Sequence, residues 1–257
     1  MGRTLSILLC MSFLLCGKSF SQSSYGIAPL EKPLVSCAAL AAKSITSDIP
    51  VYETERTETT VQIAAPDDGK SKKKSKKKLQ ETISVKQLNV TAKKTDNLYD
   101  PNEVLRNGFT VTLWVMPQKT GTERQGYILY PLDGCSTNGV MQSQWGITVD
   151  KQFIRIYERY TEERLLLEYR HHEEQDFFIA FTCQNSTPAL YVNGELASTG
   201  VQSDYRPHPA FEGMPQCPDA AKFSGKYTWL HYFCNVLTNS DISGLYRTEY
   251  AQLHKEP

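Results

Sequence analysis

The sequence predicts an all-β protein in which two antiparallel sheets stack as a sandwich, with a short C-terminal helix and an irregular N-terminal arm. Three observations support this prediction. Short runs that alternate apolar and polar residues recur from about residue 82 onward. The dipeptide Asn193-Gly194 separates two such runs, as in a tight β-hairpin. Apolar residues at helical spacing occur only near the C-terminus, at Ile242, Leu245 and Tyr246.

Residues 1–21 have the features of a secretory signal peptide. Arg3 supplies the positive charge, Leu5 to Cys16 is rich in Leu, Met and Phe, and Ser19 and Ser21 offer small residues for cleavage. The apolar run is shorter than the roughly 20 residues that a membrane-spanning helix needs. We therefore expect a secreted, extracellular protein, with a retained signal anchor as the alternative.

Residues 22–79 are predicted to form the N-terminal arm, in which Thr59–Ile63 alternates well enough to be a first strand. The arm ends in seven lysines that must remain solvated because like charges repel. They are Lys70, Lys72, Lys73, Lys74, Lys76, Lys77 and Lys78. Three interpretations stay open for this run: a flexible linker, a patch that binds a polyanion, or a processing site.

Residues 80–257 are predicted to form the sandwich domain. Its expected strands are Ile83–Val90, Phe109–Val115, Tyr127–Tyr130, Trp145–Val149, Phe153–Tyr157, Leu165–Tyr169, Phe177–Cys183, Ala189–Val192, Glu195–Ser198 and Tyr227–Val236. After the last strand, the Thr238 hydroxyl and Asp241 have the spacing of a capping box. This spacing predicts the start of the C-terminal helix.

Four motifs occur in order along this domain: FTVTLWVMP from Phe109, DFFIAFTC from Asp176, LYVNG from Leu190 and LTNSDISGLY from Leu237. Together they resemble the laminin G-like and pentraxin-like domains of the concanavalin A-like jelly-roll superfamily. The resemblance implies a jelly roll and an extracellular recognition module. The family's Trp-His-His strand motif and the acidic cluster with which pentraxins hold calcium are missing, so the resemblance carries over no particular ligand.

Five cysteines remain once the predicted signal peptide is removed, and an oxidising compartment favours two disulfides and one unpaired thiol. Spacing does not fix the pairing. The resemblance to laminin G-like domains favours Cys217–Cys234, with Cys135–Cys183 as the second bridge. Cys37 in the arm is then left over, either unpaired or linking two chains as a disulfide-bonded dimer.

Three residues are weak candidates for metal binding. Asp133 and Asp150 follow predicted strands, where the family's members hold calcium at the rim of the sandwich. Asp in a turn more often bonds its own backbone. His171 lies in a segment rich in His and Glu that could bind zinc, although neighbouring side chains on a strand point in opposite directions. We expect no cofactor, with calcium as the weak alternative.

A glycosidase of this fold would need paired carboxylates at Glu-x-Asp-x-Glu spacing, and the sequence contains no such string. Glu158, followed by Glu162 and Glu163, is expected in a solvated turn with ion pairs. Glu158 and Glu168 are the acids to test for this activity. Trp145 and Trp229 are expected mainly in the core, with sugar stacking as the alternative.

Asn89 and Asn185 each begin an Asn-x-Thr sequon, so a secreted chain could be glycosylated at either position. Of the 28 basic residues, nine lie in the signal peptide or the lysine run, which leaves 19 against 28 acidic residues. This balance argues against a nucleic-acid binder. We expect a non-enzymatic adhesion or recognition module that binds a glycan or a matrix or cell-surface protein. The alternatives are a structural component of an extracellular or mineralised matrix and, less favoured, a lectin-like glycosidase.

Overall fold

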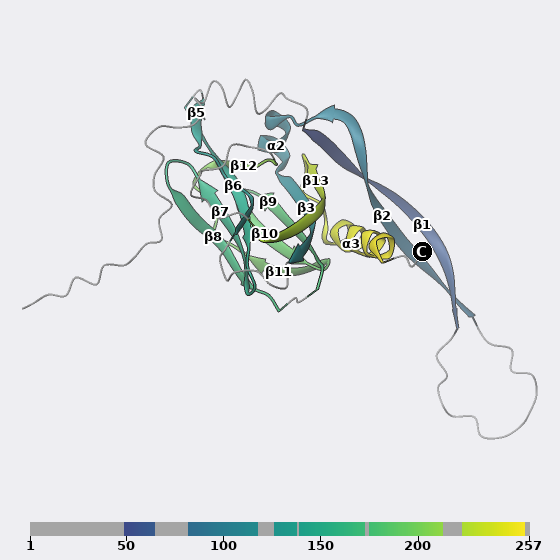
Figure 1. Cartoon of the computed structure of the whole chain (residues 1–257). Helices are drawn as coiled ribbons and strands as arrows, with labels where there is room; N and C mark the ends of the chain where they lie inside the picture. The colour runs from purple at the N-terminus through teal and green to yellow at the C-terminus, as the bar shows by residue number, and fades with distance from the viewer. Residues whose placement is uncertain are drawn as a thin grey trace, which may run out of the picture.

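Two β-sheets stack face to face in the computed structural model, which describes residues 49–64, 82–117, 126–137, 139–172, 175–212 and 223–254. A helix lies beside the sandwich, and a two-stranded ribbon extends from it (Figure 1). The predicted sandwich is therefore confirmed. Among the described residues, no helix is both long and apolar enough to cross a membrane.

The larger sheet has seven strands in the order β11-β10-β9-β3-β13-β1-β2. Its strands are β1 (Pro50–Ala64), β2 (Thr82–Leu98), β3 (Phe109–Pro117), β9 (Phe177–Gln184), β10 (Thr187–Val192), β11 (Glu195–Thr199) and β13 (Gly225–Phe233). Most pairs are antiparallel, as predicted. One is not, since β1 meets β13 in parallel at Val51 and Tyr232.

The smaller sheet has the order β12-β6-β7-β8, and two further short strands pair with β6. Its members are β4 (Gly126–Leu129), β5 (Cys135–Thr137), β6 (Val140–Val149), β7 (Phe153–Arg159), β8 (Glu163–Arg170) and β12 (Arg206–Pro209). This sheet is antiparallel as predicted except at one pair, because β12 runs parallel to β6. The chain reaches β12 from β11 of the other sheet, so no local hairpin sets the direction of β12 relative to β6.

Both faces of the seven-stranded sheet are covered. On β9, Phe177, Ile179 and Phe181 point into the core between the sheets. Their neighbours Phe178 and Ala180 point to the opposite face, into a second cluster with the C-terminal helix. Successive strand residues alternate between faces, so burial on both sides explains why β9 is apolar almost throughout.

The predicted hairpin turn at Asn193-Gly194 is confirmed, with φ of 50° and 82° at the two residues. The turn between β9 and β10 is equally tight, because Asn185 and Ser186 have φ of 50° and 58°. Asparagine tolerates this left-handed conformation better than most residues.

The C-terminal helix α3 (Asn239–Leu253) begins with the predicted capping box, in which Thr238 and Asp241 bond each other's backbone amides. A second helix, α2 (Pro101–Asn107), was not predicted. Its signals are local: Asp100 caps the helix, Pro101 occupies the first turn, and Gly108 follows its end. Seven residues are too few for an apolar stripe to be recognised.

The expected irregular arm is wrong for residues 50–64, which form the regular strand β1 and contain the predicted strand Thr59–Ile63. β1 pairs with β2 from its root to Ala64 opposite Thr82, which makes a long ribbon. The Arg56 guanidinium binds Asp241 at the start of α3 with two hydrogen bonds of 2.7 and 2.8 Å. These bonds lower the pKa of Asp241 and anchor the middle of the ribbon to the helix.

Candidate ligand-binding site

The outer face of the six-stranded sheet gathers aromatic and charged side chains. On β7, Ile154 and Ile156 point into the core, so the alternate residues Arg155, Tyr157 and Arg159 point outward. We call this surface the tyrosine–arginine face. It consists of Asp133, Asp150, Arg155, Tyr157, Glu163 and Glu168, together with Tyr127 and Arg159, which are each only 6% exposed; these residues lie on β4, β7, β8 and the segments around them.

A segment that crosses the sheet completes this face. Between β4 and β5 the chain passes over β6 at Gly146, because β4 pairs beside Ile147 and β5 pairs beside Gln142. A Cβ at Gly146 would lie 2.3 Å from Pro131 Cδ and 2.5 Å from the Leu129 carbonyl oxygen. Glycine therefore allows the crossing chain to lie directly on the sheet.

Two arginines on β7 are each held by carboxylates. Arg155 Nη1 lies 2.6 Å from Asp150 Oδ2, and its Nε lies 2.6 Å from Glu168 Oε2. Arg159 Nε lies 2.5 Å from Asp133 Oδ1. Burial opposes the charge of Arg155, but its bonds to Glu168 and Asp150 outweigh this effect and raise its pKa. Both planar guanidinium groups are thus fixed in position.

The tyrosines of the face pack against one another. The Tyr127 hydroxyl donates to Glu163 at 2.5 Å, and its ring lies 6.0 Å from that of Tyr157. Burial and then the Glu163 carboxylate raise the pKa of Tyr127 far above its ordinary value, so the phenol stays protonated as a donor. Tyr157 is half-buried and presents part of its ring.

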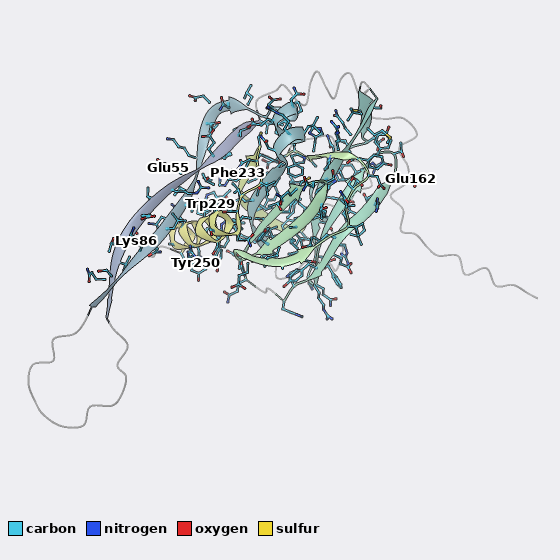
Figure 2. All side chains as sticks on the ribbon, turned by 180° about the vertical axis from the view of Figure 1, so that it is seen from behind. Glu55, Lys86, Glu162, Trp229, Phe233 and Tyr250 are labelled. Carbon is cyan, nitrogen blue, oxygen red and sulfur yellow. The ribbon has the colours of Figure 1, made fainter. Side chains whose placement is uncertain are left out.

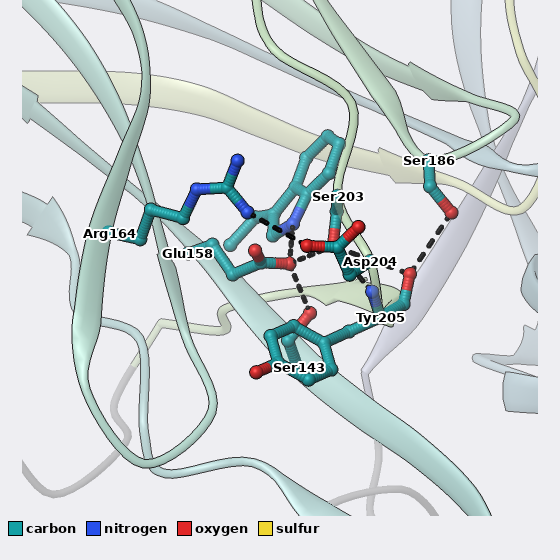
Figure 3. A network of polar contacts seen from close by, with 8 residues as sticks. Ser143, Glu158, Arg164, Ser186, Ser203, Asp204 and Tyr205 are labelled. Carbon is teal, nitrogen blue, oxygen red and sulfur yellow. Dashed lines mark hydrogen bonds and ion pairs between the residues drawn. The ribbon is translucent and has the colours of Figure 1, made fainter.

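A second aromatic pair lies at the rim, where Tyr160 stacks on Tyr205 with ring centroids 4.6 Å apart. Both rings are half-buried. Tyr205 is held from below, since its amide donates to Ser203 Oγ at 2.9 Å and its carbonyl accepts from Ser186 Oγ at 3.1 Å (Figure 3).

Glu158 lies inside the sandwich under this rim and is only 1% exposed, so the predicted solvated position is wrong. Its Oε1 accepts from Ser143 Oγ at 2.7 Å, from Trp145 Nε1 at 3.1 Å, and from Ser203 Oγ (Figure 3). Oε2 is buried without a hydrogen-bond partner among the described residues. The alternation along β7 places Glu158 on the inner face, which a charge count along the sequence does not reveal.

The weak metal candidates all bind protein groups instead. Asp133 pairs with Arg159, and Asp150 pairs with Arg155. Asp150 Oδ1 also accepts from the amides of Gln152 and Phe153, which is the alternative turn role. His171 is buried, with Nε2 2.8 Å from the Asp150 carbonyl oxygen. Within the described ranges, no three His, Cys, Asp or Glu residues form a group that could hold a metal ion.

The predicted Cys135–Cys183 disulfide is wrong. Cys135 lies in β5 of one sheet, whereas Cys183 lies in β9 of the other and carries a free thiol. Cys234 is a second buried free thiol, and its predicted partner Cys217 lies outside the described residues, as does Cys37. Burial raises the pKa of Cys183 to about 12 and that of Cys234 to about 11. Both thiols are therefore protonated and unreactive at neutral pH.

The remaining predicted positions divide between described and undescribed residues. Asn185 is exposed in its turn, whereas Asn89 lies in β2 and donates to Thr59 Oγ1 at 3.0 Å. Trp145 is fully buried, and Trp229 is half-buried with φ of 51° at a bulge in β13. The lysine run from Lys70 to Lys78 and the predicted signal peptide, residues 1–21, lie outside the described residues.

A buried acid and a histidine meet on the opposite side of the molecule, beneath α3. Glu249 Oε2 accepts from Trp114 Nε1 at 2.8 Å, and Oε1 lies 3.5 Å from His231 Nδ1. Burial raises the pKa of Glu249 to about 7 and lowers the pKa of His231 to about 4. Tyr52 at the root of the ribbon packs its ring 4.3 Å from His231.

Glu249 and His231 are predicted to make the free energy of unfolding depend on pH in opposite directions. Replacing either residue alone should reveal the contribution of the other. The raised pKa of Glu249 adds stability below pH 4.5 that is lost as the pH rises to about 7, roughly 3 kcal/mol in all. The lowered pKa of His231 adds stability above pH 6.5 that is lost as the pH falls to about 4. In the intact protein the two effects largely cancel between pH 4.5 and 6.5.

Urea unfolding at several pH values between 4 and 8 measures both contributions. We expect Glu249→Gln to leave the histidine effect alone, so that stability relative to the intact protein rises from pH 4.5 to 7. His231→Gln should show the reverse slope over the same range. Parallel pH profiles for the intact protein and both variants would contradict this assignment.

A sequence profile described as the Concanavalin A-like lectin/glucanases superfamily matches residues 92–243, which is more than half of the chain. The chain belongs to this superfamily. The jelly-roll fold expected from the four motifs is thereby confirmed, and the match begins within β2 and ends within α3. No curated protein sequence matches the chain significantly.

Solved structures that are similar to part of this chain include the following three. The botulinum neurotoxin serotype D binding domain is 16% identical, with a TM-score of 0.39, over 62% of this chain and 40% of the toxin domain. A SAP-like pentraxin from Limulus polyphemus is 14% identical, with a TM-score of 0.36, over 53% and 68% of the two chains. The CBM40 of Ruminococcus gnavus IT-sialidase, bound to α2,3-sialyllactose, is 15% identical, with a TM-score of 0.40, over 53% and 80%.

Proposed function

We propose that the protein is a secreted, non-enzymatic recognition module that binds extracellular glycans through the tyrosine–arginine face. The observation that carries this proposal is the set of fixed planar groups on that face. Aromatic rings present a negative π-face to the polarised C–H groups of a sugar. Arg155 and its two carboxylate partners, Asp150 and Glu168, offer donors and acceptors for hydroxyl groups beside Tyr157.

The charge of the face favours neutral glycans. Two guanidinium groups, of Arg155 and Arg159, face four carboxylates, of Asp133, Asp150, Glu163 and Glu168. A sulfated or carboxylated polymer would meet this excess of negative charge and be repelled. A sugar with neighbouring hydroxyls needs no charge partner and can bond both oxygens of a carboxylate.

The positions of Glu158 and Glu168, the two candidate catalytic acids, support a binding role over hydrolysis. Glu158 points into the core, whereas Glu168 pairs with Arg155 on the outer face. A glycosidase needs its two carboxylates on either side of one bond, roughly 5–10 Å apart in open space. A sheet lies between the carboxylates of Glu158 and Glu168, so they cannot flank the same sugar.

A glycan array followed by calorimetric titration of the best neutral glycan tests the proposal. We expect Tyr157→Ala to weaken binding about tenfold, since loss of one stacking ring costs roughly 1.4 kcal/mol. Arg155→Ala should weaken it at least as much, because Glu168 and Asp150 lose their common partner.

Tyr250→Ala is the matched control. Tyr250 is 45% exposed on α3, which covers the opposite face of the sandwich (Figure 2). It should bind the glycan as the intact protein does. The proposal fails if no neutral glycan binds, or if Tyr250→Ala and Tyr157→Ala weaken binding equally.

A further inference from the structure

The two edge strands of the seven-stranded sheet, β2 and β11, flank one groove. The groove has a volume of about 800 Å³. On one side it is lined by Lys86, Gln87 and Leu88, on the other by Gly194, Glu195 and Leu196, and along its floor by residues at the start of α3. Val61 of β1 also lines the groove, so the groove borders both strands of the ribbon.

Among the described residues, no strand pairs with the edge of β2 that faces away from β1. β2 is the last strand of its sheet, and β1 is the strand to which it pairs. An edge strand presents a row of backbone N–H and C=O groups to any strand laid beside it. An isolated two-stranded ribbon is at best marginally stable in water, so the outer part of this ribbon gains most from a further strand.

Natural edge strands are usually protected by lysines, prolines or bulges. The outer part of the ribbon, Thr57–Ala64 paired with Thr82–Asn89, contains only two charged residues, Glu58 and Lys86. These two pair with each other at 3.2 Å. The part contains no proline, and the register of the ribbon shifts only at its root, between Pro50 and Tyr52.

We propose that this edge of β2 pairs with the same edge of a second copy, so that two ribbons join in one four-stranded sheet and the chain forms a symmetric dimer. When two chains are related by a two-fold axis, the same strand edge of each chain can form antiparallel backbone hydrogen bonds with the other. No strand of a different protein is then required. The Lys86 residues of the two copies lie opposite each other only if the two-fold axis passes beside Lys86. In every other pairing register they are apart. Glu58 neutralises Lys86 within each chain, so the two Lys86 residues do not repel each other when the edges meet.

Both walls of the groove supply apolar surface for the same contact. Leu196 is 53% exposed on β11, and Val61 is 39% exposed on the outer ribbon. Both line the groove. A strand of the second copy laid along β2 would cover these side chains and remove them from water.

Sedimentation velocity of the secreted full-length chain under reducing conditions tests the proposal. Reduction removes any disulfide-linked dimer through Cys37. We expect a concentration-dependent dimer with a dissociation constant in the micromolar range, visible below about 100 µM. Gln87→Lys adds a charge on the edge and should weaken the dimer at least tenfold, as should Leu196→Lys on the facing wall.

Thr57→Lys is the matched control, because it adds the same charge to the exposed partner strand β1 of the same ribbon. It should dimerise as the intact chain does. A protein that remains monomeric at about 100 µM, or a dimer weakened equally by Thr57→Lys and Gln87→Lys, would overturn the proposal. Folding of each variant is checked by circular dichroism, and neutral-glycan binding per chain should not change.

Discussion

Replacing Gly146 by alanine is expected to lower the free energy of unfolding by about 2–3 kcal/mol. The new methyl group would lie 2.3 Å from Pro131 and 2.5 Å from the Leu129 carbonyl, and a backbone carbonyl cannot move aside as a flexible side chain can. The crossing segment must lift away from β6. Because this segment carries Asp133, the partner of Arg159, neutral-glycan binding should fall together with stability.

Urea unfolding of Gly146→Ala and of a matched glycine variant measures this effect. Gly139 lies just before β6 with φ of 78° and has no atom within 4 Å of an added Cβ. Gly139→Ala should therefore cost only the backbone strain, about 1 kcal/mol. If the two variants are equally stable, close packing of the crossing segment against the sheet is not what Gly146 provides.

Glu158→Ala should destabilise the protein by about 3–4 kcal/mol, the second large effect. The Glu158 carboxylate accepts hydrogen bonds from Ser143, Trp145 and Ser203, and alanine would leave all three donors in the core without an acceptor. The Ser203 hydroxyl oxygen in turn accepts a hydrogen bond from the backbone amide of Tyr205. The variant should therefore also loosen the Tyr160–Tyr205 stack, which is measurable as a reduced near-ultraviolet circular dichroism signal.

Glu158→Gln separates the hydrogen bonds from the charge. Its amide oxygen can replace Oε1 as the common acceptor, and its NH₂ group replaces the oxygen that lacks a partner among the described residues. We expect a loss of about 1 kcal/mol or less. A glutamine variant as unstable as the alanine variant would show that the negative charge itself is required at this position.

The local elements could be predicted because neighbouring residues encode them. Asn193-Gly194 adopts positive φ at both residues, and this conformation alone produces the tight turn between β10 and β11. Thr238 and Asp241 cap α3 through bonds that span three residues. The alternation in Phe109–Pro117 and Phe177–Gln184 sets which side chains share a face, whatever lies opposite.

The candidate site could not be predicted in the same way. Glu158 and Arg159 are neighbours in the sequence and both are buried, yet Glu158 lies inside the sandwich and Arg159 pairs with Asp133 on the other side of the sheet. A bulge in β8, where Leu166 is the extra residue opposite Ile156 and Tyr157, and the crossing segment decide which residues meet on the outer face. The predicted Cys135–Cys183 disulfide failed for the same reason, since the sheet to which each of these two cysteines belongs depends on strand pairing between distant segments.

The sequence by itself determined the alternating strands, the turns, the helix cap and, through the order of four motifs, the superfamily. Each of these depends on backbone conformation and side-chain direction within a few residues. Only the tertiary structure decided that Arg155 lies between two carboxylates, that Glu249 faces His231, and that β2 and β11 border one groove. Those contacts form where separate strands and helices pack together, and their energy depends on burial and distance that no single segment fixes.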